Sequence, residues 1–131
     1  MTEIHAWLVI RATHLNEDNH PEINEKEIYD KVEGIISNLK YNEIKILQRN
    51  GLNNINMFLY TNHKTKEADE LIETFTKIAE MATGSYGLLY YWNDEDNDSY
   101  DDYKVLIARK GVVEWKADDF FSPQSLKIYE E

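Results

Sequence analysis

Asn50-Gly51 lies between two runs of residues, 43–49 and 52–60, that are rich in Ile, Leu, Phe and Tyr. A two-residue hairpin turn needs positive φ angles at both central positions, and Asn-Gly adopts them at little cost. The pattern therefore predicts an antiparallel hairpin at this place. This hairpin supplies two strands of a sheet that the rest of the chain must complete.

Two helices are predicted by apolar spacing behind capping residues. Asn24, with Glu27 three residues later, resembles a capping box, and Thr65 is the expected N-cap of the second helix. Gly84 is expected to end that helix in the left-handed conformation. Gly34 interrupts the first helix at a cost of about 1 kcal/mol relative to alanine, and we expect it to pack closely on a sheet. The apolar positions are Ile28, Val32, Ile35, Ile36 and Leu39 in the first helix, and Ala68, Leu71, Ile72, Phe75, Ile78, Ala79 and Ala82 in the second.

Four further strands complete the expected fold. Residues 4–12 alternate between two faces, residues 86–92 form a continuous apolar strand, and 103–109 and 112–115 flank Lys110-Gly111 as a second hairpin. The order strand, helix, strand, strand, helix, strand, strand, strand predicts an α+β fold. We expect a mainly antiparallel sheet of about six strands with both helices packed on one face, and a ferredoxin-like βαββαβ core extended by the C-terminal hairpin. The first strand would place Ile4, Ala6, Leu8 and Ile10 on one face and His5, Trp7, Val9 and Arg11 on the other.

The chain has 131 residues, and we expect one domain over residues 1–131, with Phe120 and Phe121 holding the C-terminal tail to it. The formal net charge is −11, from 25 acidic and 14 basic side chains. Affinity for phosphate backbones comes from Lys and Arg, so this charge argues against nucleic acid and anionic membranes and favours a basic partner. The absence of cysteine excludes disulfides and thiolate metal sites. No signal-peptide pattern and no apolar segment of membrane-spanning length is present, so we expect a cytoplasmic protein.

The predicted strand at 86–92 leads directly into a loop rich in carboxylates. Neighbouring carboxylates about 6 Å apart repel each other by roughly 0.7 kcal/mol in water, so the cluster does not help folding. One interpretation is a solvated loop that keeps the protein soluble. The flanking aromatic residues favour another, because aromatic anchors among charges are typical of protein-binding surfaces. The predicted contact residues are Trp92, Asp94, Glu95, Asp96, Asp98, Tyr100, Asp101 and Asp102.

Patterns for catalysis and for metal binding are weak. Asp94, Asp96 and Asp98 alternate as in an EF-hand loop, but Ser99 stands where the turn glycine is required and Val105 where the bidentate Glu is required. The four histidines never adopt a metalloenzyme spacing, and neither a nucleophile elbow nor a phosphate-binding loop is present. Acid catalysis needs a carboxyl group in a rigid, desolvated pocket, which a surface loop does not provide. We therefore predict no enzyme, no metal site and no cofactor.

Three segments, in order along nearly the whole chain, carry a resemblance to a known family. They are Ile4-His5-Ala6-Trp7, then Gly84-Ser85-Tyr86-Gly87-Leu88-Leu89-Tyr90 with Asp94-Glu95-Asp96, then Ala108-Arg109 with Asp119-Phe120-Phe121-Ser122-Pro123. The chain thereby resembles bacterial immunity proteins of polymorphic toxin systems, in the α+β family designated immunity protein seven. It departs from the family pattern at Ala6, where the family has glycine, at Lys110, and at Gln124-Ser125-Leu126.

The resemblance implies a non-enzymatic protein that binds and neutralises a cognate toxin domain. The loop carboxylates would then meet a basic patch on the toxin, with Trp92 and Tyr100 packing against it. Where the toxin is a nuclease, the carboxylates would occupy the site at which the nuclease binds the phosphate groups of its substrate.

An alternative prediction is a regulatory module of ferredoxin-like shape that binds a small ligand in a groove at the sheet edge. The tryptophans and the nine tyrosines would line such a groove. Trp7 has a second interpretation, as a core or half-buried residue of the sheet face, while Trp115 on a terminal strand is expected on an exposed face. The sequence does not determine the oligomeric state.

Overall fold

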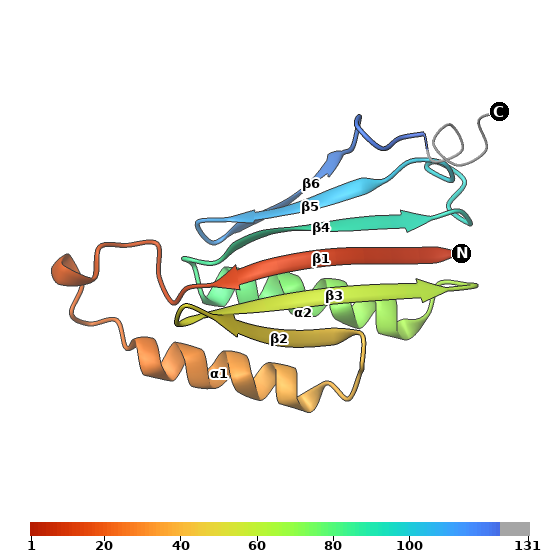
Figure 1. Cartoon of the computed structure of the whole chain (residues 1–131). Coiled ribbons are helices and arrows are strands. Elements are labelled where there is room, and N and C mark those ends of the chain that lie inside the picture. Colours follow the sequence, from red (N-terminus) through yellow and green to blue (C-terminus); the bar gives the residue numbers. More distant parts are fainter. Residues whose placement is uncertain (124–131) are drawn as a thin grey trace.

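The computed structural model describes residues 1–123. Its element order is the predicted one with an added 3₁₀ turn (Figure 1). The elements are β1 (Thr2–Ile10), η1 (Glu17–Asn19), α1 (Glu25–Asn38), β2 (Ile44–Arg49), β3 (Leu52–Thr61), α2 (Lys66–Met81), β4 (Tyr86–Asn93), β5 (Lys104–Arg109) and β6 (Val112–Ala117).

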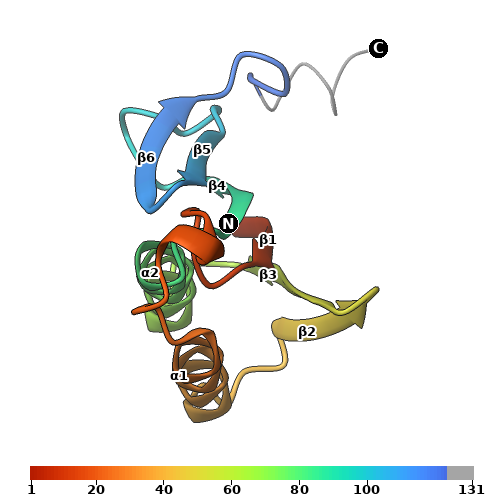
Figure 2. The ribbon, with the colours of Figure 1, turned by 90° about the vertical axis from the view of Figure 1, so that its left-hand side faces the viewer.

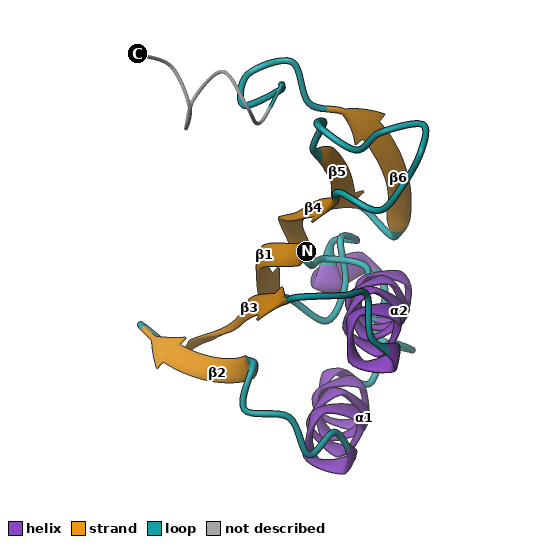
Figure 3. Ribbon diagram, turned by 90° about the vertical axis from the view of Figure 1, so that its right-hand side faces the viewer, coloured by secondary structure: helices purple, strands orange, loops and turns teal. Residues whose placement is uncertain are grey.

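All six strands form one antiparallel sheet in the order β2-β3-β1-β4-β5-β6. Both helices lie on the same side of this sheet, as Figures 2 and 3 show from opposite ends. The predicted α+β architecture, with six antiparallel strands and two helices on one face, is confirmed. The classification of β1 to β4 as a ferredoxin-like core stays a prediction.

Two tight turns set the registers of the outer hairpins. Asn50 and Gly51 have φ angles of 51° and 78°, and Lys110 and Gly111 have φ angles of 51° and 77°. Positive φ at both central residues is the two-residue hairpin turn whose twist matches that of the flanking strands. Both predicted hairpins are therefore present, between β2 and β3 and between β5 and β6.

The core lies between the sheet and the helices. Alternate residues of β1, including Ile4 and Leu8, are fully buried, and so are Leu71 and Phe75 of α2 in the same cluster. Period-two burial on the strand and helical periodicity on α2 place one apolar face of each element against the other. Fully burying each such side chain contributes about 1.5–3 kcal/mol, so this interface dominates the stability.

The predicted helix starts are correct, whereas the predicted role of Gly84 is wrong. Asn24 accepts a hydrogen bond from the backbone N–H of Glu27 at 3.1 Å, and Thr65 accepts one from that of Ala68 at 3.4 Å. The glycines with positive φ in the described part of the chain are Gly51 and Gly111. Gly84 is instead required by close approach, because a Cβ there would collide with the carbonyl of Thr13.

Gly34 does not pack on the sheet, contrary to our expectation. A Cβ at this position meets nothing within 4 Å. The reason is geometric: α1 buries Val32 and Ile36, and residue 34 lies on the opposite side of the helix.

The segment after β6 is held by polar groups. Buried Asp118 accepts hydrogen bonds from the backbone N–H groups of Phe120 and Phe121, and the Ser122 hydroxyl accepts one from the N–H of Tyr103 at 2.9 Å. The role expected for Phe120 is wrong, because its side chain is 90% exposed, whereas the Phe121 ring does contact Tyr90. The departure from the family pattern at 124–126 lies outside the described residues.

Two glycine substitutions test this description of the packing. Gly34→Ala should raise the free energy of unfolding by about 1 kcal/mol, since it removes the helix penalty of glycine without a clash. Gly87→Ala should lower it by about 1–3 kcal/mol, because the added Cβ would collide with the carbonyl of Trp7 in the neighbouring strand. Urea unfolding of both variants measures the two changes, and a loss of stability in Gly34→Ala would contradict the exposed placement.

Candidate functional site

The predicted contact residues lie together, on and around the loop that joins β4 to β5. We call residues 94–102 the acidic loop; Figure 1 places it beside the N-terminus. Successive turns order its backbone: the N–H groups of Asp96, Ser99 and Asp102 donate to carbonyl oxygens three residues earlier at 3.2–3.3 Å. The acidic loop is therefore structured by its own hydrogen bonds.

Asp96 lies at the centre of this structure. Its carboxylate accepts from the backbone N–H of Asp98 at 3.0 Å and pairs with the Lys104 ammonium at 3.5 Å. The backbone N–H of Asp98, the Ser99 hydroxyl and Lys104 together lower the pKa of Asp96 below its ordinary value. Asp96 thus serves the loop itself, and it is half-buried.

Asp94 and Glu95 border the N-terminus. The amino group of Met1 pairs with the Asp94 carboxylate, and Glu95 pairs with His63 at 3.0 Å. These pairs are exposed, and exposed ion pairs contribute roughly 0–1 kcal/mol each, so they leave the carboxylates available to a partner.

The remaining loop residues differ in what they present to solvent. Asp98 and Asp102 are exposed, Asp101 is half-buried, and the Tyr100 side chain is 64% exposed. Trp92 is only 8% exposed, and its indole N–H donates to the carbonyl oxygen of Tyr100 at 2.9 Å. Trp92 therefore supports the acidic loop from below and offers a partner almost no area, unlike the packing anchor that the sequence suggested.

The sheet face away from the helices is a second candidate surface. Alternation along β1, β3 and β4 places His5, Trp7, Phe58, Tyr86 and Tyr90 on this face. We call this side of the sheet the open face. Phe58 is 57% exposed and Trp7 is 40% exposed, so for Trp7 a core position is excluded. The alternation of residues 4–11 predicted that His5 and Trp7 share a second face of the strand, but alternation does not tell whether that face is covered.

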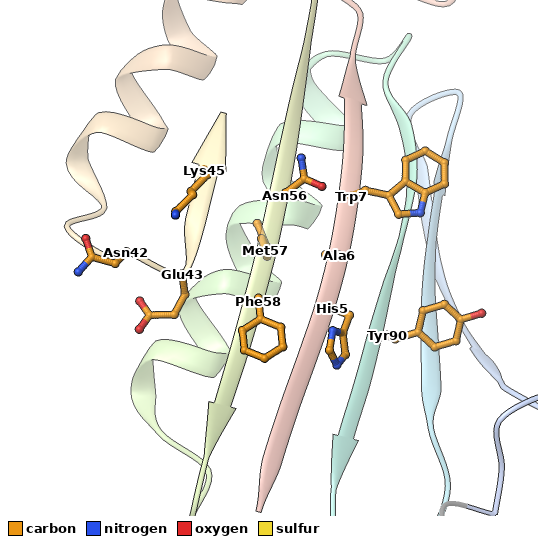
Figure 4. Close-up of a pocket in the computed structure, with 10 residues that line it drawn as sticks. All are labelled: His5, Ala6, Trp7, Asn42, Glu43, Lys45, Asn56, Met57, Phe58 and Tyr90. Atoms are coloured by element: carbon orange, nitrogen blue, oxygen red, sulfur yellow. The ribbon is translucent and has the colours of Figure 1, made fainter. Parts of the chain in front are cut away.

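A groove of about 610 Å³ runs along the open face (Figure 4). Its lining includes His5, Phe58 and Tyr90 from three adjacent strands, with Glu43 at the β2 side. A smaller hollow of about 280 Å³ adjoins it and is lined by His5, Tyr90, Tyr103 and Phe121. The two hollows share His5 and Tyr90 and so form one aromatic depression.

Trp115 lies on the helix side of the sheet and is exposed there, as expected for a terminal strand. Its ring meets Tyr91 at 6.1 Å, and both line a separate groove with Ile72 and Lys104. The three tryptophans therefore occupy three different environments.

Glu43 of the groove lining belongs to a group of carboxylates that also includes Glu67 and Glu70 of α2. Burial raises the pKa of Glu67 to about 7, and the hydrogen bond with Glu43 and the charges of Glu43 and Glu70 add to the rise. Oε1 of Glu67 is buried without a hydrogen-bond partner. Tyr41 donates to the Glu70 carboxylate, and this bond raises the pKa of Tyr41 to about 12. Glu67 is consequently a protonatable carboxyl group next to Glu43 of the groove lining.

Two negative findings apply to the described residues. Among residues 1–123, no group of three or more His, Asp or Glu side chains is arranged to hold a metal ion. Within the same part of the chain, no helix has the length and apolar character needed to cross a membrane.

Comparison with known protein families identifies a match over nearly the whole chain. The family model described as immunity protein 7 matches residues 1–130, nearly the whole chain. Searches of curated proteins and of solved structures gave no match.

Glu67 should make stability depend on pH in a defined direction. Its pKa is 4.5 ordinarily and about 7 in the fold, so its favourable contribution is complete below pH 4.5 and is lost as the pH rises through 7. Glu67→Gln, which cannot ionise, should therefore gain stability relative to the wild type as the pH is raised from 4.5 to 8. Thermal unfolding at several pH values measures this difference, with Glu80→Gln, an exposed carboxylate of the same helix, as the control for loss of one charge. A constant difference between Glu67→Gln and the wild type would show that the carboxyl is not desolvated.

Proposed function

Because this chain belongs to the immunity protein 7 family, we propose that it neutralises its cognate toxin domain by presenting the acidic loop to a basic surface of that toxin. An immunity protein implies a cognate toxin partner and acts as an inhibitor, in agreement with the prediction that this chain is not an enzyme. The ordered, exposed carboxylates of the loop are the observation that carries the proposal.

Charge supports this choice of surface. The net charge of −11 attracts a cationic partner from a distance, and the loop concentrates part of that charge at one end of the sheet. Electrostatic attraction of this kind raises association rates above about 10⁶ M⁻¹s⁻¹, toward 10⁸–10⁹ M⁻¹s⁻¹ at low salt. An inhibitor that must capture a toxin before it acts benefits from a fast encounter.

The ordered backbone of the acidic loop also supports the proposal that this loop contacts the toxin. The turn hydrogen bonds of the loop and the Trp92–Tyr100 bond hold the backbone before any partner arrives. A preorganised surface loses less conformational entropy on binding, so more of the interaction energy becomes affinity. A loop that served solubility alone would need no such internal support.

The chemistry of the loop also suggests a class of toxin. Carboxylates on a structured backbone are mimics of phosphate groups, and a nuclease carries basic residues that bind phosphates. A nuclease domain is therefore the partner that we propose first, with the acidic loop lying over its nucleic-acid site.

Neutralising exposed loop carboxylates tests the proposal. The triple variant Glu95→Gln, Asp98→Asn, Asp102→Asn keeps Asp94 and Asp96, which bind the N-terminus and order the loop. Association with the cognate toxin domain should slow by about 10-fold or more at low ionic strength, and its dependence on salt should weaken. Stopped-flow or biosensor kinetics between 20 and 500 mM salt give both quantities.

The matched control is Glu33→Gln, Glu73→Gln, Glu80→Gln, which removes the same number of exposed carboxylates from α1 and α2. It should slow association less than the loop variant, because its charges lie on the helix layer. Equal effects of the two triple variants would mean that only net charge matters and that the acidic loop is no contact surface.

A further inference from the structure

The open face carries a row of aromatic side chains that crosses three strands in register. His5 of β1 is paired with Phe58 of β3 and with Tyr90 of β4. The His5 and Phe58 rings meet edge to face at 5.1 Å, and Figure 4 shows the three side chains next to one another along the groove. We call this row of His5, Phe58 and Tyr90 the aromatic platform.

A second pair extends the platform along the sheet. Trp7, two residues beyond His5, meets Tyr86 edge to face at 6.2 Å. Water-facing positions of an antiparallel sheet are ordinarily polar, which keeps the solvated face soluble. Aromatic residues at these positions instead mark an interaction surface, because monomeric proteins seldom expose large apolar patches without a use for them.

Carboxylates border the platform and define its chemistry. Glu43 lines the groove beyond Phe58, and Glu3 accepts from the Tyr103 hydroxyl at 3.3 Å and pairs with His5 at 2.6 Å. Rings with carboxylates beside them favour a cation on an apolar stem, since the stem packs on the rings while the charge meets the acids. Among the described residues that line the groove, Lys45 of β2 is the one Lys or Arg.

The platform is continuous with the acidic loop. Tyr103, in the smaller hollow, packs at 6.3 Å from the ring of Trp92, which holds the Tyr100 carbonyl of the loop. A body that covers the loop therefore reaches the hollow next. Protein interfaces commonly have this composition, an apolar aromatic centre with a charged rim.

We propose that the open face, centred on Phe58, His5 and Tyr90, is the apolar centre of the toxin interface and receives an Arg or Lys side chain of the toxin. The inference rests on the proposed function, in which the acidic loop is the charged rim. The rim governs the rate of encounter, whereas the centre governs how long the complex lasts.

Truncation of two platform residues tests this assignment. Phe58→Ala and Trp7→Ala should each raise the dissociation rate of the toxin complex by about 10-fold or more, while the association rate and its salt dependence stay near those of the wild type. Trp115→Ala is the matched control, an aromatic residue 44% exposed on the helix side of the sheet, and it should leave dissociation unchanged. Thermal unfolding of all three variants shows whether each is folded at the assay temperature, and Phe58→Leu replaces Phe58→Ala if that variant unfolds.

The outcomes separate the two proposals. If the wild type does not bind the toxin domain, the proposed function fails. If the wild type binds and loop neutralisation slows association, but the platform variants dissociate like the wild type, the further inference alone is overturned. Sedimentation of the free protein tests whether the open face binds a second copy of this chain. If the wild type is a dimer and Phe58→Ala is a monomer, the open face is a dimer interface, and the inference is overturned.

Discussion

The six-stranded sheet has two faces, and the two long helices of residues 1–123 cover one of them. The packing of β1 against α2, through Ile4, Leu8, Leu71 and Phe75, buries the residues that contribute most to stability. Once these side chains face the helices, the period of two along each strand leaves no choice for their neighbours. The residues between them must face away, whatever their polarity, and the rest of the surface follows from this constraint.

That constraint explains how one end of the molecule comes to combine rings and charges. The outward residues of β1, β3 and β4 include the five aromatic side chains of the open face, and the chain leaves β4 directly into the acidic loop. Tyr103 and Trp92 join the two regions through ring contacts. An aromatic face and a carboxylate loop that are adjacent in space give a partner both area for packing and charge for attraction, which is the combination an inhibitor of a basic protein requires.

Local signals in the sequence were sufficient to predict the helices and strands and to predict that the loop residues lie together. Asn50-Gly51, Asn24 and Thr65 act through backbone geometry and hydrogen bonds within a few residues, so their structures could be predicted. The errors concern packing that a local pattern does not specify. Gly84 lies against Thr13, and Phe120 is exposed, while hydrogen bonds of Asp118 and Ser122 hold the segment after β6. Trp92 looked like an exposed anchor beside charged residues, and only the fold of the loop over it shows that it is buried. The same limit applies to Trp7, because the alternation of a strand does not say which face lacks a cover.

The structure of this chain in complex with its toxin domain would show directly which surface the toxin covers. We expect the toxin to cover the acidic loop and the open face together, with a cationic side chain of the toxin beside His5 and Phe58, and we expect α1 and α2 to stay in solvent. A complex in which the toxin sits on the helix layer and leaves both of these regions free would contradict this expectation.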